Sequence, residues 1–234
     1  MPTVVILSPH FDDAVLNCWS LIREPSTLVL TVFAGIPPKG THAWWDRVCG
    51  QADSHQMMLM RRQENEAAVA ISGNTNAQIC LDYLDHQYHT GSPSAAELAD
   101  RIEAASPKGC AFAAPLAISR LYPHPNHILV RQAGLELRRR GHSVLFYPDS
   151  PYMSLPRTPA ESALRRVQTQ AEKAFGFAMS VNVNELNAAQ LKAKANAMHA
   201  YKTQYRMTNL TSLWGFDRIA RRRYEVVLIP APHA

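Results

Sequence analysis

Near its beginning the chain reads Val4-Val5-Ile6-Leu7-Ser8-Pro9-His10-Phe11-Asp12-Asp13-Ala14. Its first four residues form a short apolar run rich in β-branched side chains, which is typical of a strand buried on both faces of a parallel sheet. Polar residues follow at once, and an apolar helical pattern then continues to Leu21. This succession indicates an α/β fold with a polar turn at the carboxyl end of its first strand.

The rest of the chain repeats the alternation of strand and helix. Further strand candidates lie at Leu28–Phe33, Ile79–Leu84, Ala111–Leu116, Val144–Tyr147 and Val226–Ile229. Helical patterns lie at Met57–Ile71, Ala95–Ala105, Pro125–Arg140, Ala160–Phe175 and Glu185–Tyr201, and the one long irregular segment is Ala34–Gly50. We expect one α/β domain over residues 1–234, with a Rossmann-like, doubly wound, mostly parallel sheet and helices on both faces. Such sheets bind ligands at the carboxyl ends of their strands, where the strand order reverses.

The composition excludes several classes of protein. Hydrophobic residues make up 47% of the 234 residues and charged residues 18%, which argues against a disordered chain. No apolar run is long enough for a transmembrane helix, and the N-terminus lacks the basic start of a signal peptide. The cysteines Cys18, Cys49, Cys80 and Cys110 form no CxxC pair. They suit free thiols, so we expect a cytoplasmic location.

The net charge of +5 is a weak indication of nucleic-acid binding. Arg138, Arg139 and Arg140 close a predicted helix that has Pro125 at its start and Gly141 just beyond its end. Basic residues in a last turn complement the helix dipole, so this run is better explained as a solvated helix end. We therefore expect no nucleic-acid partner.

The polar turn after the first strand carries an imidazole and two carboxylates, from His10, Asp12 and Asp13. One alternative is structural, because an aspartate is a common N-cap of a helix. A cap needs one carboxylate and no histidine, so this alternative leaves two polar groups unexplained. The turn therefore favours metal binding or acid–base chemistry.

A second polar cluster follows the predicted strand Ala111–Leu116 and reads His124-Pro125-Asn126-His127. The i, i+3 spacing places both imidazoles on one side of a helical turn. His10, Asp13 and His127 can supply two imidazoles and one carboxylate to a zinc ion, which leaves a fourth position for water. Three protein ligands and a water are typical of catalytic zinc.

The two clusters resemble the paired signatures of the PIG-L family, usually written A-H-P-D-D-E and H-P-D-H. Further similarities lie at Arg61-Arg62-Gln63-Glu64, Ala68, Ser72-Gly73, Leu84-Asp85 and the segment Lys194–Gln204. The family consists of zinc-dependent N-deacetylases acting on N-acetylglucosamine-type amides. The resemblance implies that His10, Asp13 and His127 bind zinc and that Asp12 is the general base for the zinc-bound water. It further implies that a protonated His124 stabilises the oxyanion or protonates the leaving amine.

Three positions depart from the family pattern. Phe11 replaces a proline, Ala14 a glutamate and Asn126 an aspartate. None is a proposed ligand or base, so the zinc chemistry is retained. Ala14 removes one expected contact near the site, and neutral Asn126 removes any electrostatic effect of an aspartate on His124.

Four further residues are candidates for substrate binding. Arg61 or Arg62 can bind a phosphate or a sugar hydroxyl, although pairing with nearby glutamates on a helix surface explains them almost as well. Asp85 can accept hydrogen bonds from a sugar or merely open a turn. Trp44, with its neighbour Trp45, can stack on a sugar ring or anchor the long loop.

The leading hypothesis is therefore a zinc-dependent N-deacetylase whose substrate is a small N-acylated amino sugar or a conjugate of one. A zinc amidase for a non-sugar or thiol-conjugate amide and a non-catalytic binding domain of the same fold remain alternatives. The sequence leaves the acyl group, the pathway and the oligomeric state open, including a homo-oligomer.

Overall fold

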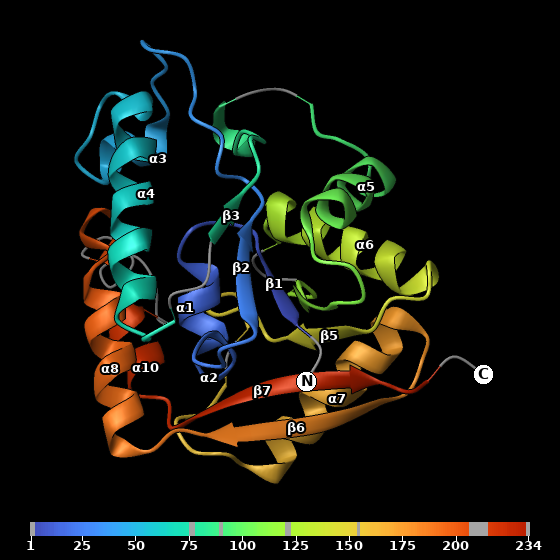
Figure 1. The fold of residues 1–234 in the computed structure, drawn as a ribbon. Coiled ribbons are helices and arrows are strands. Elements are labelled where there is room, and N and C mark those ends of the chain that lie inside the picture. The colour runs from blue at the N-terminus through green and yellow to red at the C-terminus, as the bar shows by residue number, and fades with distance from the viewer. Residues whose placement is uncertain are drawn as a thin grey trace.

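A seven-stranded sheet forms the centre of the computed structural model, with the strand order β3-β2-β1-β4-β5-β7-β6 (Figure 1). The structure describes residues 3–74, 78–88, 91–119, 123–153, 155–205 and 215–232. The strands are β1 (Val4–Ser8), β2 (Thr27–Thr31), β3 (Gln78–Cys80), β4 (Ala111–Pro115), β5 (Val144–Tyr147), β6 (Met179–Glu185) and β7 (Tyr224–Pro230). β1 to β5 run parallel, whereas β7 is antiparallel to both β5 and β6. The sheet is therefore mixed and mostly parallel, as predicted.

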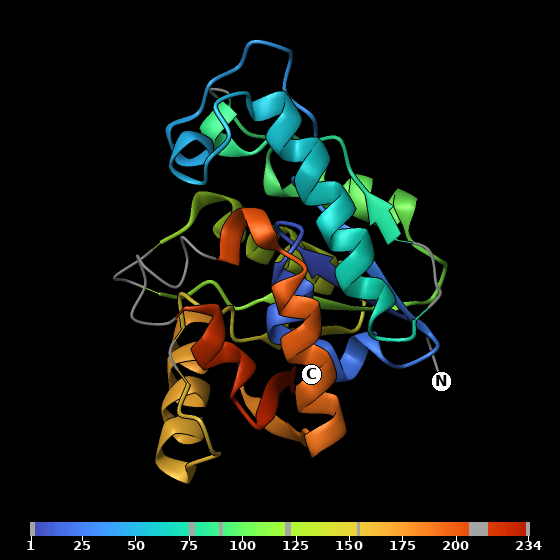
Figure 2. The same cartoon turned by 90° about the vertical axis from the view of Figure 1, so that its left-hand side faces the viewer.

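Helices cover both faces of the sheet (Figures 1 and 2). On one face lie α5 (Ala95–Ala105), α6 (Pro125–Arg139) and α7 (Glu161–Phe175). On the other lie α1 (Asp13–Asn17), α2 (Trp19–Ile22), α4 (Ser54–Ala70), α8 (Ala188–His199) and α10 (Phe216–Ala220). The short α3 (Trp44–Val48) lies beside α4, and a 3₁₀ helix, η1 (His86–Tyr88), follows β3. Within the described ranges, no helix combines the length and the apolar character needed to span a bilayer.

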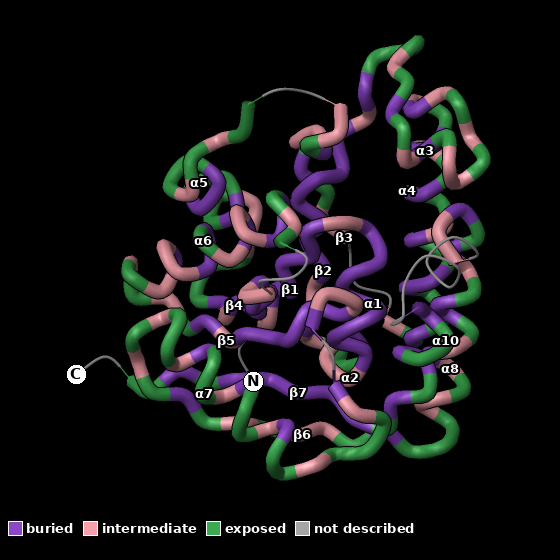
Figure 3. The backbone as a smooth tube through the Cα atoms, turned by 180° about the vertical axis from the view of Figure 1, so that it is seen from behind, coloured by how far each residue is buried: buried purple, intermediate pink, exposed green. Residues whose placement is uncertain are grey.

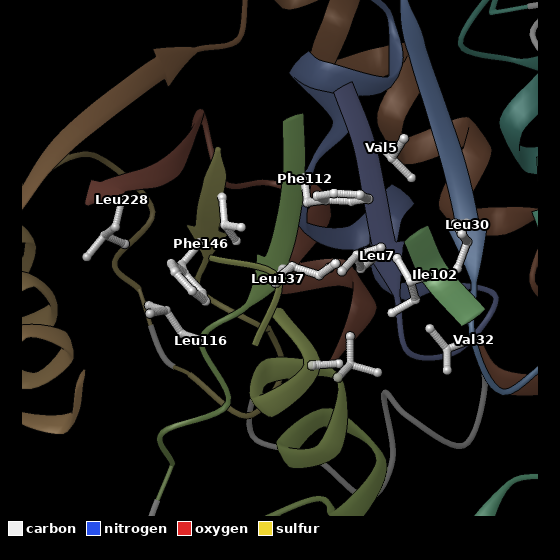
Figure 4. Packing of buried hydrophobic residues seen from close by; sticks show 14 of the residues in the cluster. Val5, Leu7, Leu30, Val32, Ile102, Phe112, Leu116, Leu137, Phe146 and Leu228 are labelled. Carbon is white, nitrogen blue, oxygen red and sulfur yellow. The ribbon is translucent and has the colours of Figure 1, made fainter. Parts of the chain in front are cut away.

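The strands are buried because helices pack against them from both sides, as Figure 3 shows for the centre of the sheet. Val5, Leu7 and Phe112 point to the α5–α6 face, and each has no exposed surface. Figure 4 shows these side chains packed together with Leu137 of α6. Burial on both faces explains the uninterrupted apolar runs that mark these strands in the sequence.

The strand order reverses between β1 and β4. β1 pairs with β2 on one side and with β4 on the other, so the connections leaving β1 and β4 diverge in opposite directions. The divergence opens a crevice at the carboxyl ends of these two strands, where doubly wound sheets bind their ligands. The two predicted polar clusters follow these two strands.

Some predicted boundaries differ from the structure. The predicted helix Glu185–Tyr201 begins only at Ala188, because Glu185 is the last residue of the unpredicted strand β6. β6 alternates half-buried Val181 and Val183 with exposed Ser180 and Asn182, which is a strand period. The segment Ala34–Gly50 is not wholly irregular, since it contains α3.

The basic run at the end of α6 is used within the fold. Arg140 forms ion pairs with Glu136 of its own helix and with Asp100 and Glu103 of α5, at 3.0, 2.6 and 3.1 Å. The Arg138 guanidinium lies 4.6 Å from the ring centroid of Phe177. These contacts agree with the interpretation of the run as a helix end.

Candidate functional site

Loops at the carboxyl ends of five parallel strands surround one cavity of about 530 Å³. These loops follow β1 to β5, and the segment after β2 contributes Phe33, Trp44 and Trp45. The cavity residues that they contribute include His10, Asp12, Asp13, Asp85, His86, His124 and Tyr152. The cavity therefore lies at the reversal of strand order, and both predicted polar clusters contribute to it.

The turn after β1 does not use its carboxylates to cap the following helix. Asp12 occupies the N-cap position of α1, yet its side chain accepts no capping hydrogen bond. The Asp13 carboxylate instead accepts a 2.8 Å bond from the backbone N–H of His10, and Ser8 Oγ accepts one of 3.0 Å from the N–H of Ala14. The turn is thus closed by Ser8 and Asp13, which argues against the capping alternative for Asp12.

His10, Asp13 and His127 come together as predicted. One donor atom from each lies within 4.8 Å of the others, and the described residues contain no second group of this kind. Asp13 Oδ2 lies 3.3 Å from both His10 Nδ1 and His127 Nε2. His127 Nε2 is buried without a hydrogen-bond partner among the described residues, although unpartnered buried nitrogens are rare. Two imidazoles, one carboxylate and an unpartnered nitrogen fit a divalent metal.

Asp149 holds the imidazole of His127 and was not predicted. Its Oδ2 lies 3.1 Å from His127 Nδ1, and its Oδ1 accepts a 2.9 Å bond from the N–H of Ala117. A carboxylate on Nδ1 fixes the ring and leaves Nε2 for a metal, which is the usual support of a histidine ligand. Asp149 follows β5 directly, so a search of every strand end would have found it.

Asn126 bridges the two clusters. Its Nδ2 lies 2.9 Å from His10 Nε2 and 3.0 Å from Asp85 Oδ1, and the residue is 2% exposed. The sequence predicted only a lost electrostatic effect on His124 at this position. The contacts of Asn126 are with His10 and Asp85 instead, and an aspartate here would face the Asp85 carboxylate.

Burial shifts the acid–base properties of Asp12 and His124 in opposite directions. Burial, together with the Asp13 charge, raises the pKa of Asp12 from 3.8 to about 6. Burial, reinforced by His10 and His127, lowers the pKa of His124 from 6.5 to about 2. Nδ1 of His124 is buried and without a partner among the described residues. At neutral pH, Asp12 is therefore a carboxylate and His124 a neutral imidazole.

The structure separates the two arginine candidates. Arg61 lines the cavity and is 6% exposed, and its guanidinium lies 3.0 Å from Asp46 rather than beside a glutamate of its own helix. Arg62 is not among the described cavity residues, and its guanidinium donates to the Ala34 carbonyl at 3.3 Å. Tyr88 donates a 2.8 Å bond to Asp46, which ties α3, α4 and η1 together.

The other substrate-binding candidates line the same cavity. Trp44 is 73% exposed, and its ring centroid lies 5.9 Å from that of half-buried Trp45. Trp45 agrees with the loop-anchoring alternative, while Trp44 has a face open to a ligand. Asp85 is 7% exposed and accepts bonds from the side chains of Asn126 and Gln87. Ala14, by contrast, is fully buried and absent from the described lining.

Comparison with known proteins gives one family match and one curated relative of note. The family model described as PIG-L: GlcNAc-PI de-N-acetylase matches residues 5–138. The relative is the 2'-N-acetylparomamine deacetylase of Niallia circulans, which is 27% identical over 186 residues. That alignment covers 63% of this chain and 66% of the relative, so the chain spans just under two thirds of its length.

Solved structures share the fold over nearly the whole chain. A deacetylase of the teicoplanin biosynthesis pathway superposes with a TM-score of 0.73 and 23% identity, covering 99% of this chain and all of the other. The zinc-inhibited form of teicoplanin deacetylase Orf2 gives a TM-score of 0.71 and 21% identity with the same coverage. At these identities the likeness concerns the fold.

Proposed function

Because the chain belongs to the PIG-L family, we propose that it is a zinc-dependent hydrolase that removes an N-acetyl group from an amino sugar or an amino-sugar conjugate. The observation that carries the proposal is the grouping of His10, Asp13 and His127 at a cavity that Asp12 also lines. The relatives support the sugar substrate, since one is named for 2'-N-acetylparomamine. We extend the proposal to the whole chain as one catalytic domain, because residues from His10 to Phe216 line one cavity.

His10, Asp13 and His127 would hold the zinc ion, with Asp149 fixing the His127 imidazole. A bound zinc ion would supply Lewis-acid chemistry, polarising the amide carbonyl and making water more acidic. The donor set contains no cysteine, which agrees with a catalytic rather than a structural site. Four free cysteines support a reducing, cytoplasmic location as part of the proposal.

Asp12 is the proposed general base. It takes a proton from the attacking water as the water oxygen bonds to the amide carbon, and its raised pKa suits this exchange near neutral pH. The same proton then passes to the amide nitrogen as the carbon–nitrogen bond breaks. The remaining hydroxyl proton of the acetic acid then passes to the amine, so the products are acetate and an ammonium group, and atoms and charge balance.

His124 is the proposed stabiliser of the substrate oxyanion. Its lowered pKa favours a neutral imidazole that donates a hydrogen bond, in place of the protonated form expected from the sequence. Arg61 and Trp44 are the proposed substrate contacts, the first as a buried cation in the wall and the second as a stacking surface at the mouth. Asp85 acts by holding its neighbours.

The test is acetate release from a panel containing 2'-N-acetylparomamine, N-acetylglucosamine, N-acetylglucosaminyl glycosides and N-acetylcysteine, together with metal analysis of the protein. We expect one zinc per chain and turnover of a sugar amide. Asp12→Asn should lower kcat at least 100-fold and leave the zinc content unchanged. Asp82→Asn is the matched control, since Asp82 is an exposed aspartate absent from the described lining. Full activity of Asp12→Asn would refute the role of this base, and turnover of N-acetylcysteine alone would refute the sugar substrate.

A further inference from the structure

His86 lies beside the site but plays no part in the mechanism derived above. It opens η1, directly after Asp85. Its Nδ1 lies 2.8 Å from Asp85 Oδ1, and Asp85 is itself held by Asn126 Nδ2 at 3.0 Å and by the Gln87 side chain at 3.1 Å. Asp85 is 7% exposed, so the carboxylate that orients His86 is a fixed, buried group. The imidazole of His86 is therefore anchored through one of its two nitrogens.

The other nitrogen of His86 is available for a ligand. The side chain is 42% exposed and lines the cavity, and no described residue forms a hydrogen bond with Nε2. Its ring packs edge-on against that of His124, with 5.0 Å between centroids. The hydrogen bond to Asp85 raises the pKa of His86, because it stabilises the protonated ring. Because Nδ1–H donates to Asp85, the open Nε2 accepts a hydrogen bond when the ring is neutral and donates one when it is protonated.

The order of the rings places His86 on the outer wall of the site. The His124 ring lies 4.8 Å from the ring of the proposed ligand His10 and 5.0 Å from that of His86. His124 thus separates His86 from the metal ligands. An acetyl group is small and must reach Asp12 and the ligands, so its carbonyl cannot also reach the outer wall. His86 therefore faces the larger part of the substrate, which carries the amine after hydrolysis.

We propose that His86, held by Asp85 through Nδ1–H, is a substrate-binding residue whose Nε2 forms a hydrogen bond with a hydroxyl group on the amine side of the scissile amide. A sugar hydroxyl can donate to the neutral ring or accept from the protonated one, and an amide flanked only by hydrocarbon offers no such group. The inference rests on the proposed function and adds a specificity contact to it. All N-acetylated substrates release the same acetate, so this contact distinguishes substrates by the amine that they carry.

Two variants separate the open nitrogen from the anchored one. His86→Asn places an amide N–H near the position of Nδ1 and so keeps a donor for Asp85, but it removes Nε2. His86→Gln places its amide near the position of Nε2 and keeps an outer hydrogen-bonding group. His142→Asn is the matched control, because His142 contacts Glu103 and packs on Phe112, away from the described cavity lining.

We expect His86→Asn to raise KM for the best sugar substrate of the panel about 10-fold, which is the loss expected for one hydrogen bond, and to change kcat little. His86→Gln should recover most of the affinity, and His142→Asn should match the wild type. Calorimetric binding of the free amine product should weaken in His86→Asn by the same factor, with the zinc content unchanged. The proposal would be overturned if His86→Asn had the same KM and product affinity as the wild type. A defect seen only in His86→Gln would also overturn it.

The wild-type protein separates this inference from the proposed function. If the wild type releases no acetate from any sugar amide, the proposed function is wrong, whatever the variants do. Paromamine binding then decides the role of His86: weaker binding to His86→Asn than to His142→Asn supports the contact, and equal or undetectable binding overturns it. If the wild type is active, only the His86 variants bear on the contact.

Discussion

At the scale of single residues, the site depends on side chains that hold other side chains. Asp149 fixes His127, and Asn126 joins His10 to Asp85. The exchange of the family's aspartate for Asn126 is compatible with these contacts, because an amide donates where a second carboxylate would repel Asp85. Asn126 and Asp85 thus form one polar pair, and a change at either position alters the other.

The role of Asp149 can be tested through metal affinity. In the wild type, one carboxylate oxygen of Asp149 faces the His127 imidazole and the other accepts from the Ala117 N–H. Asp149→Asn leaves only one acceptor oxygen for these two donors. We expect zinc affinity to fall 10- to 100-fold, as is typical when a carboxylate behind a histidine ligand is removed. Competition with a chromogenic chelator measures the change. Asp100→Asn, an exposed aspartate of α5, is the control, and equal zinc affinity in both variants would contradict the role.

Sequence reasoning found the residues that lie near one another in the chain or that repeat a known pattern. His10, Asp12, Asp13, His124 and His127 form two short clusters, so their positions relative to the strands could be predicted. Asp149, Asn126 and His86 act through contacts with residues far away in the sequence. Such contacts depend on how the loops converge, and the sequence indicates only that Asp149 follows a predicted strand end.

At the scale of elements, most strands and the long helices were predicted well where the pattern was strong, but the strand predicted at Ile79–Leu84 is only Gln78–Cys80. α5, α6 and α7 match their predicted ranges to within a residue or so. The direction of β7 and the existence of β6 were not predicted. β6 is an edge strand with polar Asn182 and Asn184, and it lacks the continuous apolar run of the buried strands.

A buried ion pair connects two of these elements beneath the site. Lys194 of α8 lies 2.6 Å from Glu225 of β7, and both are at most 1% exposed. The Glu225 carboxylate also accepts bonds of 2.8 and 2.7 Å from the N–H groups of Trp19 and Ser20, which begin α2. A helix start offers unpaired N–H groups, so Glu225 stabilises the start of α2 in addition to pairing with Lys194.

We expect Glu225→Gln to lower the free energy of unfolding by about 3 kcal/mol or more, because Lys194 is left charged and unpaired in the interior. Urea denaturation measures the loss. The double variant Glu225→Gln/Lys194→Met should recover part of the lost stability, since Lys194→Met removes the unpaired charge. Glu161→Gln, an exposed glutamate of α7, should stay within about 0.5 kcal/mol of the wild type. A similarly small effect of Glu225→Gln would contradict this account.

The ion pairs at the end of α6 should respond to acid. Hydrogen bonds from Arg139 and Arg140 lower the pKa of Glu136 from 4.5 to about 2. A carboxylate with a lowered pKa stabilises the folded state above pH 4.5, and this contribution is lost as the pH falls from about 4.5 towards 2. Glu136→Gln should therefore lower Tm slightly at pH 7 and reduce the further fall between pH 5 and 3. Parallel curves for the variant and the wild type would argue against this contribution.

At the scale of the whole molecule, the proposed zinc ion joins segments that are distant in the chain. His10 and Asp13 follow β1, and His127 lies on α6 after β4. A metal that binds only when these segments are in place stabilises the fold, by about 4 kcal/mol at 1,000 times its Kd. Removing the metal with a chelator should lower Tm, and added zinc should restore it. Asp13→Asn should abolish the response, and an unchanged Tm in the wild type would count against a metal bound by the folded state.

The strand order also has a consequence for how the chain is made. β6 is joined to the sheet only through β7, and β7 is the later of the two to leave the ribosome. Until β7 emerges, β5 presents a free edge and β6 has no neighbour in the sheet. Unpaired strand edges invite pairing with other chains, so the nascent protein is exposed to aggregation in this interval. When β7 pairs with β5 and β6, it also places Glu225 against the start of α2.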